Sequence, residues 1–161
     1  MSKDQNILIV DDHPENLIAL EAILEEVDCS LLKANSGNEA LGVLLKHEVA
    51  LVLLDVQMPG MDGFEVAELM RRSNRTKMVP IIFVTAISKE AKYVARGYNV
   101  GAIDYMFKPL NPEILQHKAR FFLDLDTQKR RLEEKLRKSQ ESKEAFLKAM
   151  GVANPDSQPP Q

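Results

Sequence analysis

The chain alternates short apolar runs with longer segments of helical periodicity, and this pattern restricts the fold more than any other feature. Five apolar runs have the length and composition of buried strands: residues 7–10, 30–34, 51–54, 80–84 and 105–107. Helices are predicted after Pro14 and over residues 39–47, 64–72 and 89–98. Strands joined by helical crossovers run parallel and need helices on both faces of the sheet. The sequence therefore predicts an open, doubly wound α/β domain with five parallel strands.

Size and charge limit the number of domains and their partners. The chain has 161 residues, 45% of them hydrophobic, which is enough for one full core. Residues 1–110 carry 11 basic and 16 acidic side chains, whereas residues 111–161 carry 10 basic and 8 acidic ones. We therefore expect these two parts to be different structures. The formal net charge of -3 does not indicate a nucleic-acid surface over the whole molecule.

Cysteine usage and hydropathy bear on the compartment. Cys29 is the only cysteine, so an internal disulfide is excluded and a reducing environment is favoured. No apolar run approaches membrane-spanning length, and the polar N-terminus MSKDQN lacks the core of a signal peptide. We expect a soluble, cytoplasmic protein.

Polar side chains gather where the predicted strands end. They are Asp11, Asp12, Asp55, Thr85 and Lys108, and each follows a strand directly or within one residue. Taken singly, each has an ordinary structural explanation, because Asp often starts a helix or turn and a Lys before a proline is usually solvated. In doubly wound sheets, however, ligands bind beyond the carboxyl ends of the strands. The five together favour a shared functional site.

The chemistry of such a site follows from its charges. Two carboxylates about 4 Å apart repel each other by about 4 kcal/mol at an effective dielectric near 20, so Asp11, Asp12 and Asp55 would bind a proton or a cation. Oxygen ligands suit Mg2+, which leaves room for a phosphate. Lys108 and Thr85 would supply a charge and a hydroxyl for phosphoryl oxygens. Because no glycine-rich loop precedes a lysine, a nucleotide is an unfavoured phosphoryl donor.

Four short motifs now identify a family resemblance. They are LIVDDHPEN, the segment from Asp55 to Gly63, VTA at residues 84–86 and YMFKP at residues 105–109. In this order and at these strand ends they resemble the receiver domain of two-component response regulators, over roughly residues 5–125. The resemblance implies a flavodoxin-like sheet with the strand order 2-1-3-4-5. It also implies a phosphorelay role, with a histidine kinase or phosphotransfer protein as one partner and a downstream output domain or protein as another.

The resemblance also assigns the acidic residues. Asp55 would be the phosphoacceptor that takes a phosphoryl group from a phosphohistidine. Asp12 and Asp55 would bind Mg2+ directly, together with the backbone carbonyl of Gln57, and Asp11 would act mainly through water. On this view the domain is a phosphoacceptor signalling module and not a conventional enzyme.

The remaining motif residues would form the switch. Lys108 would pair with Asp55 or its phosphate, across a cis Lys108–Pro109 bond, and the Ala86 amide would help to hold an oxygen. Thr85 would be drawn toward the new charge. Tyr105 would rotate into the space that Thr85 vacates, although an ordinary half-buried strand aromatic explains it equally well.

Two further positions bear on the lifetime of the phosphorylated state. In the family, Gln57 and Ile87 occupy places that flank the path of the hydrolytic water. Neither an amide nor an aliphatic side chain is a general base. We therefore expect slow self-dephosphorylation.

Beyond the receiver, a helix is predicted from near Pro112 to about residue 150. Apolar residues recur at 3-4 spacing, at Leu125, Leu132, Leu136, Phe146 and Met150. Lys129, Ser139 and Lys143 interrupt this seam. We expect a receiver over residues 1–125, a helical connector over 126–150 and a disordered Pro/Gln-rich tail over 151–161. The connector is either a coiled coil that joins a homodimer or a solvated single helix with i,i+4 ion pairs.

Two other functions remain open at this point. A phosphatase of the haloacid-dehalogenase type would need a second acid two residues after the nucleophile, where this chain has Gln57. A scaffold that keeps the fold without being phosphorylated would be expected to lack one of the acids, the threonine or the lysine. No complete output domain fits after residue 125, so the chain is either a stand-alone regulator or the N-terminal piece of a longer protein. Direct nucleic-acid binding and membrane association are not expected.

Overall fold

The computed structural model describes residues 4–86, 95–96, 98–99, 101 and 104–152. The chain divides into two compact units, Met1–Leu123 and Asp124–Gln161. Among the described residues, no helix combines the length and the apolar character needed to cross a bilayer.

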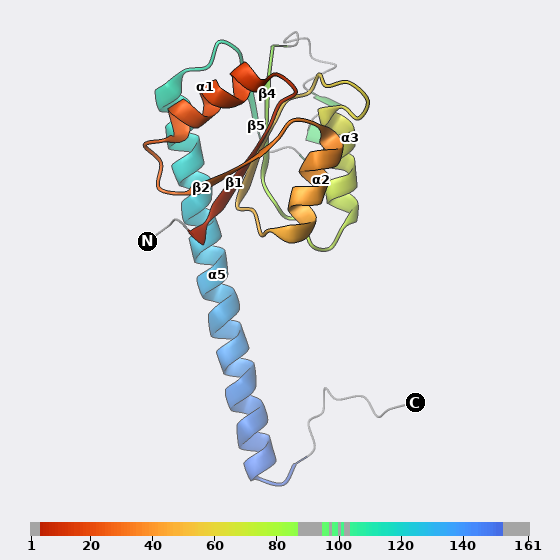
Figure 1. Cartoon of the computed structure of the whole chain (residues 1–161). Helices are drawn as coiled ribbons and strands as arrows, with labels where there is room; N and C mark the ends of the chain where they lie inside the picture. The colour runs from red at the N-terminus through yellow and green to blue at the C-terminus, as the bar shows by residue number, and fades with distance from the viewer. Residues whose placement is uncertain (1–3, 87–94, 97, 100, 102–103, 153–161) are drawn as a thin grey trace. The chain divides into compact units, whose positions relative to one another are not determined.

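The first unit is built on one sheet of five parallel strands, which confirms the predicted fold class (Figure 1). The strands are β1 (Asn6–Val10), β2 (Ser30–Ala34), β3 (Leu51–Leu54), β4 (Ile81–Thr85) and β5 (Asp104–Phe107). They lie in the order β2-β1-β3-β4-β5, and all four pairings are parallel. In β1, β3 and β4 the strand residues are nearly all buried, as expected for a sheet that is covered on both faces.

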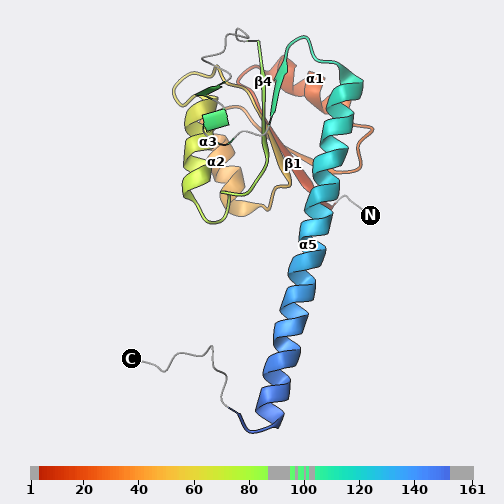
Figure 2. The same cartoon turned by 180° about the vertical axis from the view of Figure 1, so that it is seen from behind.

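The described helices cover the two faces of this sheet. They are α1 (Pro14–Leu24), α2 (Gly37–Lys46), α3 (Gly63–Arg72) and α5 (Pro112–Ala149). Figures 1 and 2 show α2 and α3 on one face and α1 with the beginning of α5 on the other. The helix predicted over 89–98 lies for the most part outside the described residues, and so does the predicted tail from residue 153 onward.

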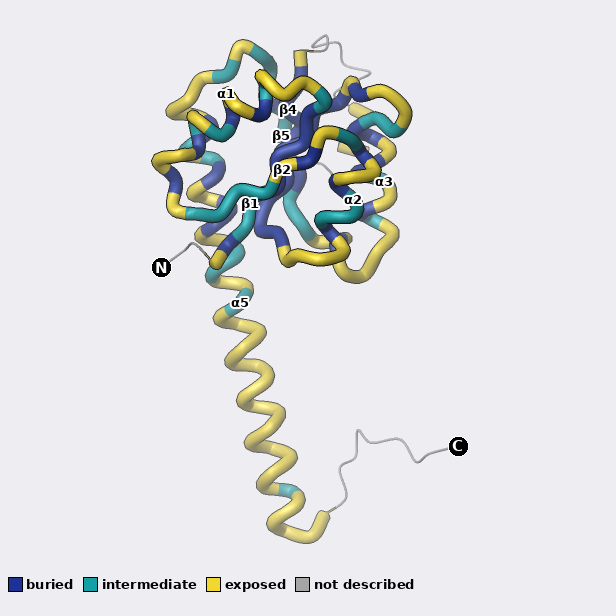
Figure 3. Tube along the Cα trace, viewed as in Figure 1, coloured by how far each residue is buried: buried dark blue, intermediate teal, exposed yellow. Residues whose placement is uncertain are grey.

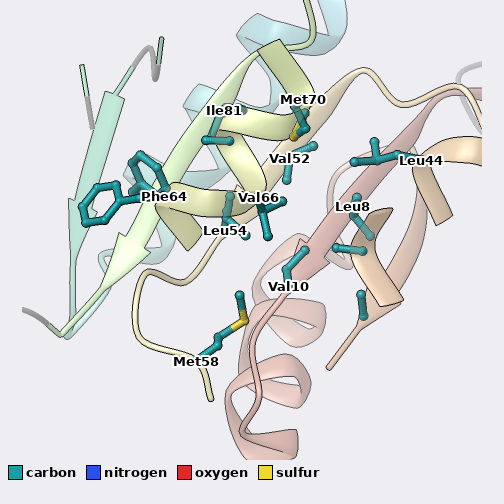
Figure 4. Packing of buried hydrophobic residues seen from close by; sticks show 14 of the residues in the cluster. Leu8, Val10, Leu44, Val52, Leu54, Met58, Phe64, Val66, Met70 and Ile81 are labelled. Carbon is teal, nitrogen blue, oxygen red and sulfur yellow. The ribbon is translucent and has the colours of Figure 1, made fainter. Parts of the chain in front are cut away.

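Two separate cores result from this layering. Alternate residues of β1 enter different cores: Leu8 and Val10 pack toward α2 and α3, whereas Ile7 and Ile9 pack toward α1 and α5. Figure 4 shows the first core, in which the α3 side chains Val66 and Met70 lie close to strand residues. The burial pattern along the chain places the central strands in the interior (Figure 3).

Helices α2 and α3 begin at side-chain caps. Ser36 Oγ accepts a hydrogen bond from the Glu39 backbone N–H at 3.1 Å, and Asp62 Oδ1 accepts one from the Glu65 N–H at 2.9 Å. Both caps therefore satisfy an N–H group that has no partner within its helix. α2 was predicted to begin at Glu39, but it begins at Gly37 because Ser36 already serves as its cap.

Arg71 ties the end of α3 to the loops that follow it. Its guanidinium donates hydrogen bonds to the carbonyls of Lys77, Val79 and Gly101 at 3.0, 2.8 and 2.7 Å. Gly101 has a φ of +86°, and a Cβ there would lie 2.6 Å from Arg71 Nε. A glycine is therefore required at this position both for its backbone conformation and for its contact.

The second unit contains the rest of α5. From Asp124 to Ala149 most residues are exposed. Ion pairs one helical turn apart include Arg130–Asp126 at 3.0 Å and Lys138–Glu134 at 3.9 Å. Arg137 also pairs with Glu134 and Glu141. Such pairs support an exposed helix only weakly, because solvent screens their charges.

Gly63 provides a test of how tightly α3 is packed against the end of β3. A Cβ at Gly63 would lie 2.2 Å from the backbone oxygen of Asp55, whereas a Cβ at Gly42, inside α2, would meet nothing within 4 Å. We expect Gly63→Ala to lower the free energy of unfolding by about 1–3 kcal/mol. The control Gly42→Ala should raise it by about 0.5–1 kcal/mol, because glycine disfavours a helix interior. Urea unfolding of both variants measures the difference, and equal effects would contradict it.

Candidate functional site

The carboxyl ends of the strands bring the predicted polar residues to one edge of the sheet. The backbone hydrogen-bond ladder continues one residue past each strand. Asp11 N–H donates to the Ala34 carbonyl at 3.2 Å, and Asp55 N–H donates to the Val10 carbonyl at 3.0 Å. Lys108 N–H donates to the Thr85 carbonyl at 3.0 Å. The backbone of each of these residues is thereby fixed by the neighbouring strand.

Asp11 is fully buried and well partnered. Its Oδ1 accepts hydrogen bonds from the His13 backbone N–H at 2.9 Å and from Asn16 Nδ2 at 3.3 Å, and its Oδ2 accepts one from Lys108 Nζ at 3.0 Å. Burial by itself would raise the pKa of Asp11, but these hydrogen bonds and the positive charge of Lys108 lower it below its usual value. Asp11 is therefore a stable carboxylate at neutral pH.

Asp55 is also buried, but its environment acts in the opposite direction. Only 6% of the residue is exposed. Burial and the negative charge of Asp11 raise the pKa of Asp55 to about 6, against a smaller lowering by Lys108. The two carboxylates are therefore unequal, and Asp55 is the one that gains most from an additional positive charge.

Asp12 completes an acidic cluster with Asp11 and Asp55. One ligand atom from each of these residues, together with one from His13, lies within 4.8 Å of all the others. Asp12 Oδ1 is buried and has no hydrogen-bond partner among the described residues. A buried carboxylate oxygen without a donor is costly unless a cation binds it, so the donor set fits a divalent ion with oxygen ligands.

Lys108 lies close enough to both buried carboxylates to influence their pKa values. We expected it to pair with Asp55 or its phosphate, but in this structure its Nζ forms an ion pair with Asp11 at 3.0 Å. Lys108 itself contributes to the lowered pKa of Asp11, and its pairing with Asp55 or the Asp55 phosphate stays a prediction. The Lys108–Pro109 peptide bond is cis, as predicted.

The predicted switch residues lie on β4 and β5 or next to them. Thr85 is buried and forms the last residue of β4, so the strand ends one residue later than predicted. Tyr105 is half-buried on β5, and its ring lies near three others: Phe83 at 5.3 Å, Phe107 at 5.6 Å and Tyr98 at 5.8 Å between centroids. Ala86 and Gln57 are exposed, and Ile87 lies outside the described residues.

A cavity of about 500 Å³ opens in the loop that follows Asp55. It is lined by Val56, Gln57, Met58, Pro59, Asp62, Phe64 and Arg96. The Arg96 guanidinium lies 4.5 Å from the centroid of the Phe64 ring, which is a cation–π distance. Val56 and Gln57, which directly follow Asp55 in the chain, form part of the lining, whereas Asp55 itself does not.

Two neighbours of the acidic cluster were not predicted from the sequence. No role was predicted for Asn16, and His13 entered only as part of the motif LIVDDHPEN. Asn16 lies in the first turn of α1, where its side-chain amide donates a hydrogen bond to Asp11. The one signal available was the position of His13, immediately after the acidic pair.

Comparison with known proteins agrees with this geometry. The family model of the response regulator receiver domain matches residues 7–120. The chain belongs to this family. A receiver domain is a signalling domain of two-component phosphorelays and not a conventional enzyme, which argues against the phosphatase alternative.

Individual relatives differ widely in length. The receiver is 36% identical to the protein PilH of Pseudomonas aeruginosa over 109 residues, which are 68% of this chain and 89% of PilH. It is 37% identical over 110 residues to a probable cyclic di-GMP phosphodiesterase of Vibrio cholerae, but these cover 68% of this chain and only 24% of that protein. For the transcriptional regulatory protein ResD of Bacillus subtilis the identity is 37%, over 69% of this chain and 45% of the relative. The chain thus spans less than half the length of several of its relatives.

Solved structures show the same fold. The receiver superposes on a CheY-like receiver domain from Methanospirillum hungatei with a TM-score of 0.70 and 29% identity, covering 78% of this chain and 98% of that one. A two-component response regulator from Clostridium difficile gives a TM-score of 0.68 and 32% identity, over 74% and 96% of the two chains.

The raised pKa of Asp55 has a consequence for stability in the metal-free receiver. Because its folded-state pKa lies above the ordinary value of 3.8, the folded chain holds a proton that the unfolded chain releases. The resulting stabilisation is complete below about pH 4 and is lost as the pH rises through about 6. Asp55→Asn has no such loss, so it should exceed the wild type in unfolding free energy by about 2–3 kcal/mol at pH 7 and by little near pH 4.

Urea unfolding in the presence of a chelator, at several pH values between these limits, measures the difference. A stability difference between Asp55→Asn and the wild type that stays constant across this range would contradict the prediction.

Proposed function

We propose that Asp55 accepts a phosphoryl group from the phosphohistidine of a histidine kinase or phosphotransfer protein. The observation that carries the proposal is the pairing of unequal carboxylates: Asp11 is occupied by Lys108, whereas the buried Asp55 has a pKa raised to about 6. An Asp55 oxygen forms a bond to phosphorus as the P–N bond of the phosphohistidine breaks, and the electron pair of that bond stays on the imidazole nitrogen. The product is an acyl phosphate.

The site residues proposed to hold Mg2+ are Asp12 and Asp55, with the backbone carbonyl of Gln57 and with Asp11 acting through water. The buried Oδ1 of Asp12, which accepts no hydrogen bond among the described residues, supports this assignment. When bound, Mg2+ would neutralise charge on the phosphoryl oxygens. The cavity beside the 56–59 loop would admit the phosphoryl donor.

Lys108, Thr85 and Ala86 are proposed to respond to the new charge. A phosphate adds about two negative charges at a point where Asp55 carried at most one. Lys108 then has a stronger partner than Asp11, and the Thr85 hydroxyl and the Ala86 N–H can donate to phosphoryl oxygens. Both lie at the end of β4, next to the strand of Asp55 in the sheet.

Tyr105 is the residue through which this change would reach the surface. Its ring packs against Phe83 on the neighbouring strand. A shift of Thr85 toward the phosphate would alter the space next to β5, and the Tyr105 ring would move with it. Such a two-state movement needs about 5.5 kcal/mol of differential stabilisation to convert a 1:99 population to 99:1, which a few charge-assisted hydrogen bonds supply.

Phosphorylation can be tested with the chain itself. Incubation with acetyl phosphate and Mg2+ should add one phosphoryl group, detected by intact mass spectrometry. Asp55→Asn should remain unmodified. Asp124→Asn is the matched control, because Asp124 is an exposed aspartate on α5 outside the acidic cluster and outside the cavity, and it should be modified like the wild type. An unmodified wild type would favour the scaffold alternative.

A chase of the labelled protein measures the lifetime of the product. Gln57 and Ile87 provide no general base, so the phosphoryl group should persist for minutes or longer. Loss of the label within seconds would contradict slow self-dephosphorylation.

We further propose that residues 126–150 of α5 form a connector that pairs with a second copy of the chain and passes the signal to an output. Leu132 and Leu136 are 68% and 61% exposed, and a shallow groove of about 390 Å³ runs along Leu125, Leu132 and Leu136. The ion pairs along the same helix also suit a solvated single helix, so they do not decide between the two states. Transfer from a kinase would place the chain in the cytoplasm.

The oligomeric state tests the connector. Leu132→Glu should weaken self-association at least about tenfold, because each partner loses about 1.5–3 kcal/mol of apolar burial. Ala145→Glu adds the same charge outside the 3-4 seam and should have little effect. Light scattering over a range of concentrations measures both, and a wild type that stays monomeric would leave the single solvated helix as the correct description.

A further inference from the structure

His13 occupies the cap position of α1 without acting as a cap. Its backbone is extended, with φ of -99° and ψ of 113°, and its side chain makes no capping hydrogen bond. The imidazole lies instead against the acidic cluster, where Nδ1 is 3.2 Å from Asp12 Oδ1 and 3.4 Å from Asp11 Oδ1. The fold therefore directs a nitrogen donor at the same point as the carboxylates.

The distance between His13 and Asp12 matches that of two ligands on one ion. Donor atoms that bind a six-coordinate cation at about 2.1 Å and at right angles lie about 3.0 Å apart, and opposite donors about 4.2 Å apart. The observed Nδ1–Oδ1 separation is 3.2 Å, and the widest separation in the whole cluster is 4.8 Å. Small side-chain rotations would bring His13, Asp12 and Asp55 to one cation, while Asp11 stays with Lys108.

The contact between these two atoms is not a hydrogen bond. Asp12 Oδ1 is buried and lacks a hydrogen-bond partner among the described residues, although His13 Nδ1 is close to it. A proton donor and its acceptor would be expected to align, whereas two donors of electron pairs that share a cation need only be adjacent. The separation of 3.2 Å fits an ion pair when the imidazole is protonated, and it equally fits joint ligation of one cation when the imidazole is neutral.

We propose that His13 is a direct ligand of the cation in this cluster, and that it makes the site prefer transition ions such as Mn2+ over Mg2+. This inference deepens the proposed function and rests on its cation site. Mg2+ selects oxygen ligands, whereas imidazole suits transition ions and raises their affinity in the order from Mn2+ toward Cu2+. An all-oxygen site suits Mg2+ and Mn2+ alike, so the imidazole is what would separate these two ions.

Pulsed EPR of bound Mn2+ tests this ligation directly. With less than one equivalent of Mn2+, the wild-type chain should show modulation from a directly bound imidazole nitrogen. His13→Asn should lose this signal, and the variant should fold, because Asn is a favoured cap residue. His117→Asn is the matched control: His117 is an exposed histidine outside the cluster, so its replacement should leave the signal unchanged. An absent signal in the wild type, or one that survives in His13→Asn, would overturn the proposal.

Competition between the two metals gives a second measurement. The ratio of Mn2+ affinity to Mg2+ affinity, measured by titration, should fall at least about tenfold in His13→Asn. A ratio that does not change would show that His13 acts only through its charge, which would overturn direct ligation.

The proposed function is tested separately, by Mg2+-dependent labelling of the wild type. A labelled wild type without nitrogen modulation rejects His13 as a ligand and leaves Asp55 as the phosphoacceptor. An unlabelled wild type with nitrogen modulation rejects the phosphoacceptor and keeps the ligand.

Discussion

The burial of two carboxylates beside Lys108 is the constraint on which this site depends. Asp11 and Asp55 follow neighbouring strands and are both almost completely enclosed, yet Lys108 forms an ion pair with only one of them. The sheet leaves little freedom in this choice, because each backbone is held by the adjacent strand. The result is one satisfied carboxylate and one that a further positive charge would stabilise.

This arrangement reduces stability in order to create reactivity. Folding to a structure with a protonated or uncompensated Asp55 is less favourable at neutral pH than folding with an amide at the same place. The two apolar cores on either side of the sheet supply the stability that the site gives up. The polar residues lie at the strand ends because the side chains inside the strands pack into the two apolar cores, on both faces of the sheet.

Much of this could be predicted from sequence, because the strands of a covered parallel sheet are continuous apolar runs. The bounds of β2 and β3 agree with the prediction, and the acids that follow the strands were placed at the correct edge. Helix ends were less accurate. Val27 fits the periodicity of α1 but lies beyond its end at Leu24, and it is still buried because a turn brings it back to the core.

The interactions within the site were harder to predict. Whether Lys108 binds Asp11 or Asp55 depends on the balance of hydrogen bonds around two similar carboxylates. Asn16 and the backbone of His13 decide that balance, and neither belongs to a motif that sequence alone would connect to Lys108. The direction of the His13 side chain depends on its rotamer, which the periodicity of the sequence does not predict.

The contact between Gly63 and the carbonyl of Asp55 has a consequence for the loop that joins them. The first residue of α3 is held against the main chain at the end of β3, and Gly63 N–H also donates to the Val56 carbonyl at 2.9 Å. The hydrogen bond between Gly63 and Val56 therefore joins the two ends of the loop. Adding or removing one residue would break this closure. Engineering of the segment should therefore keep its length, retain the buried Val56 and Met58 and the cap Asp62, and change only exposed positions such as Gln57.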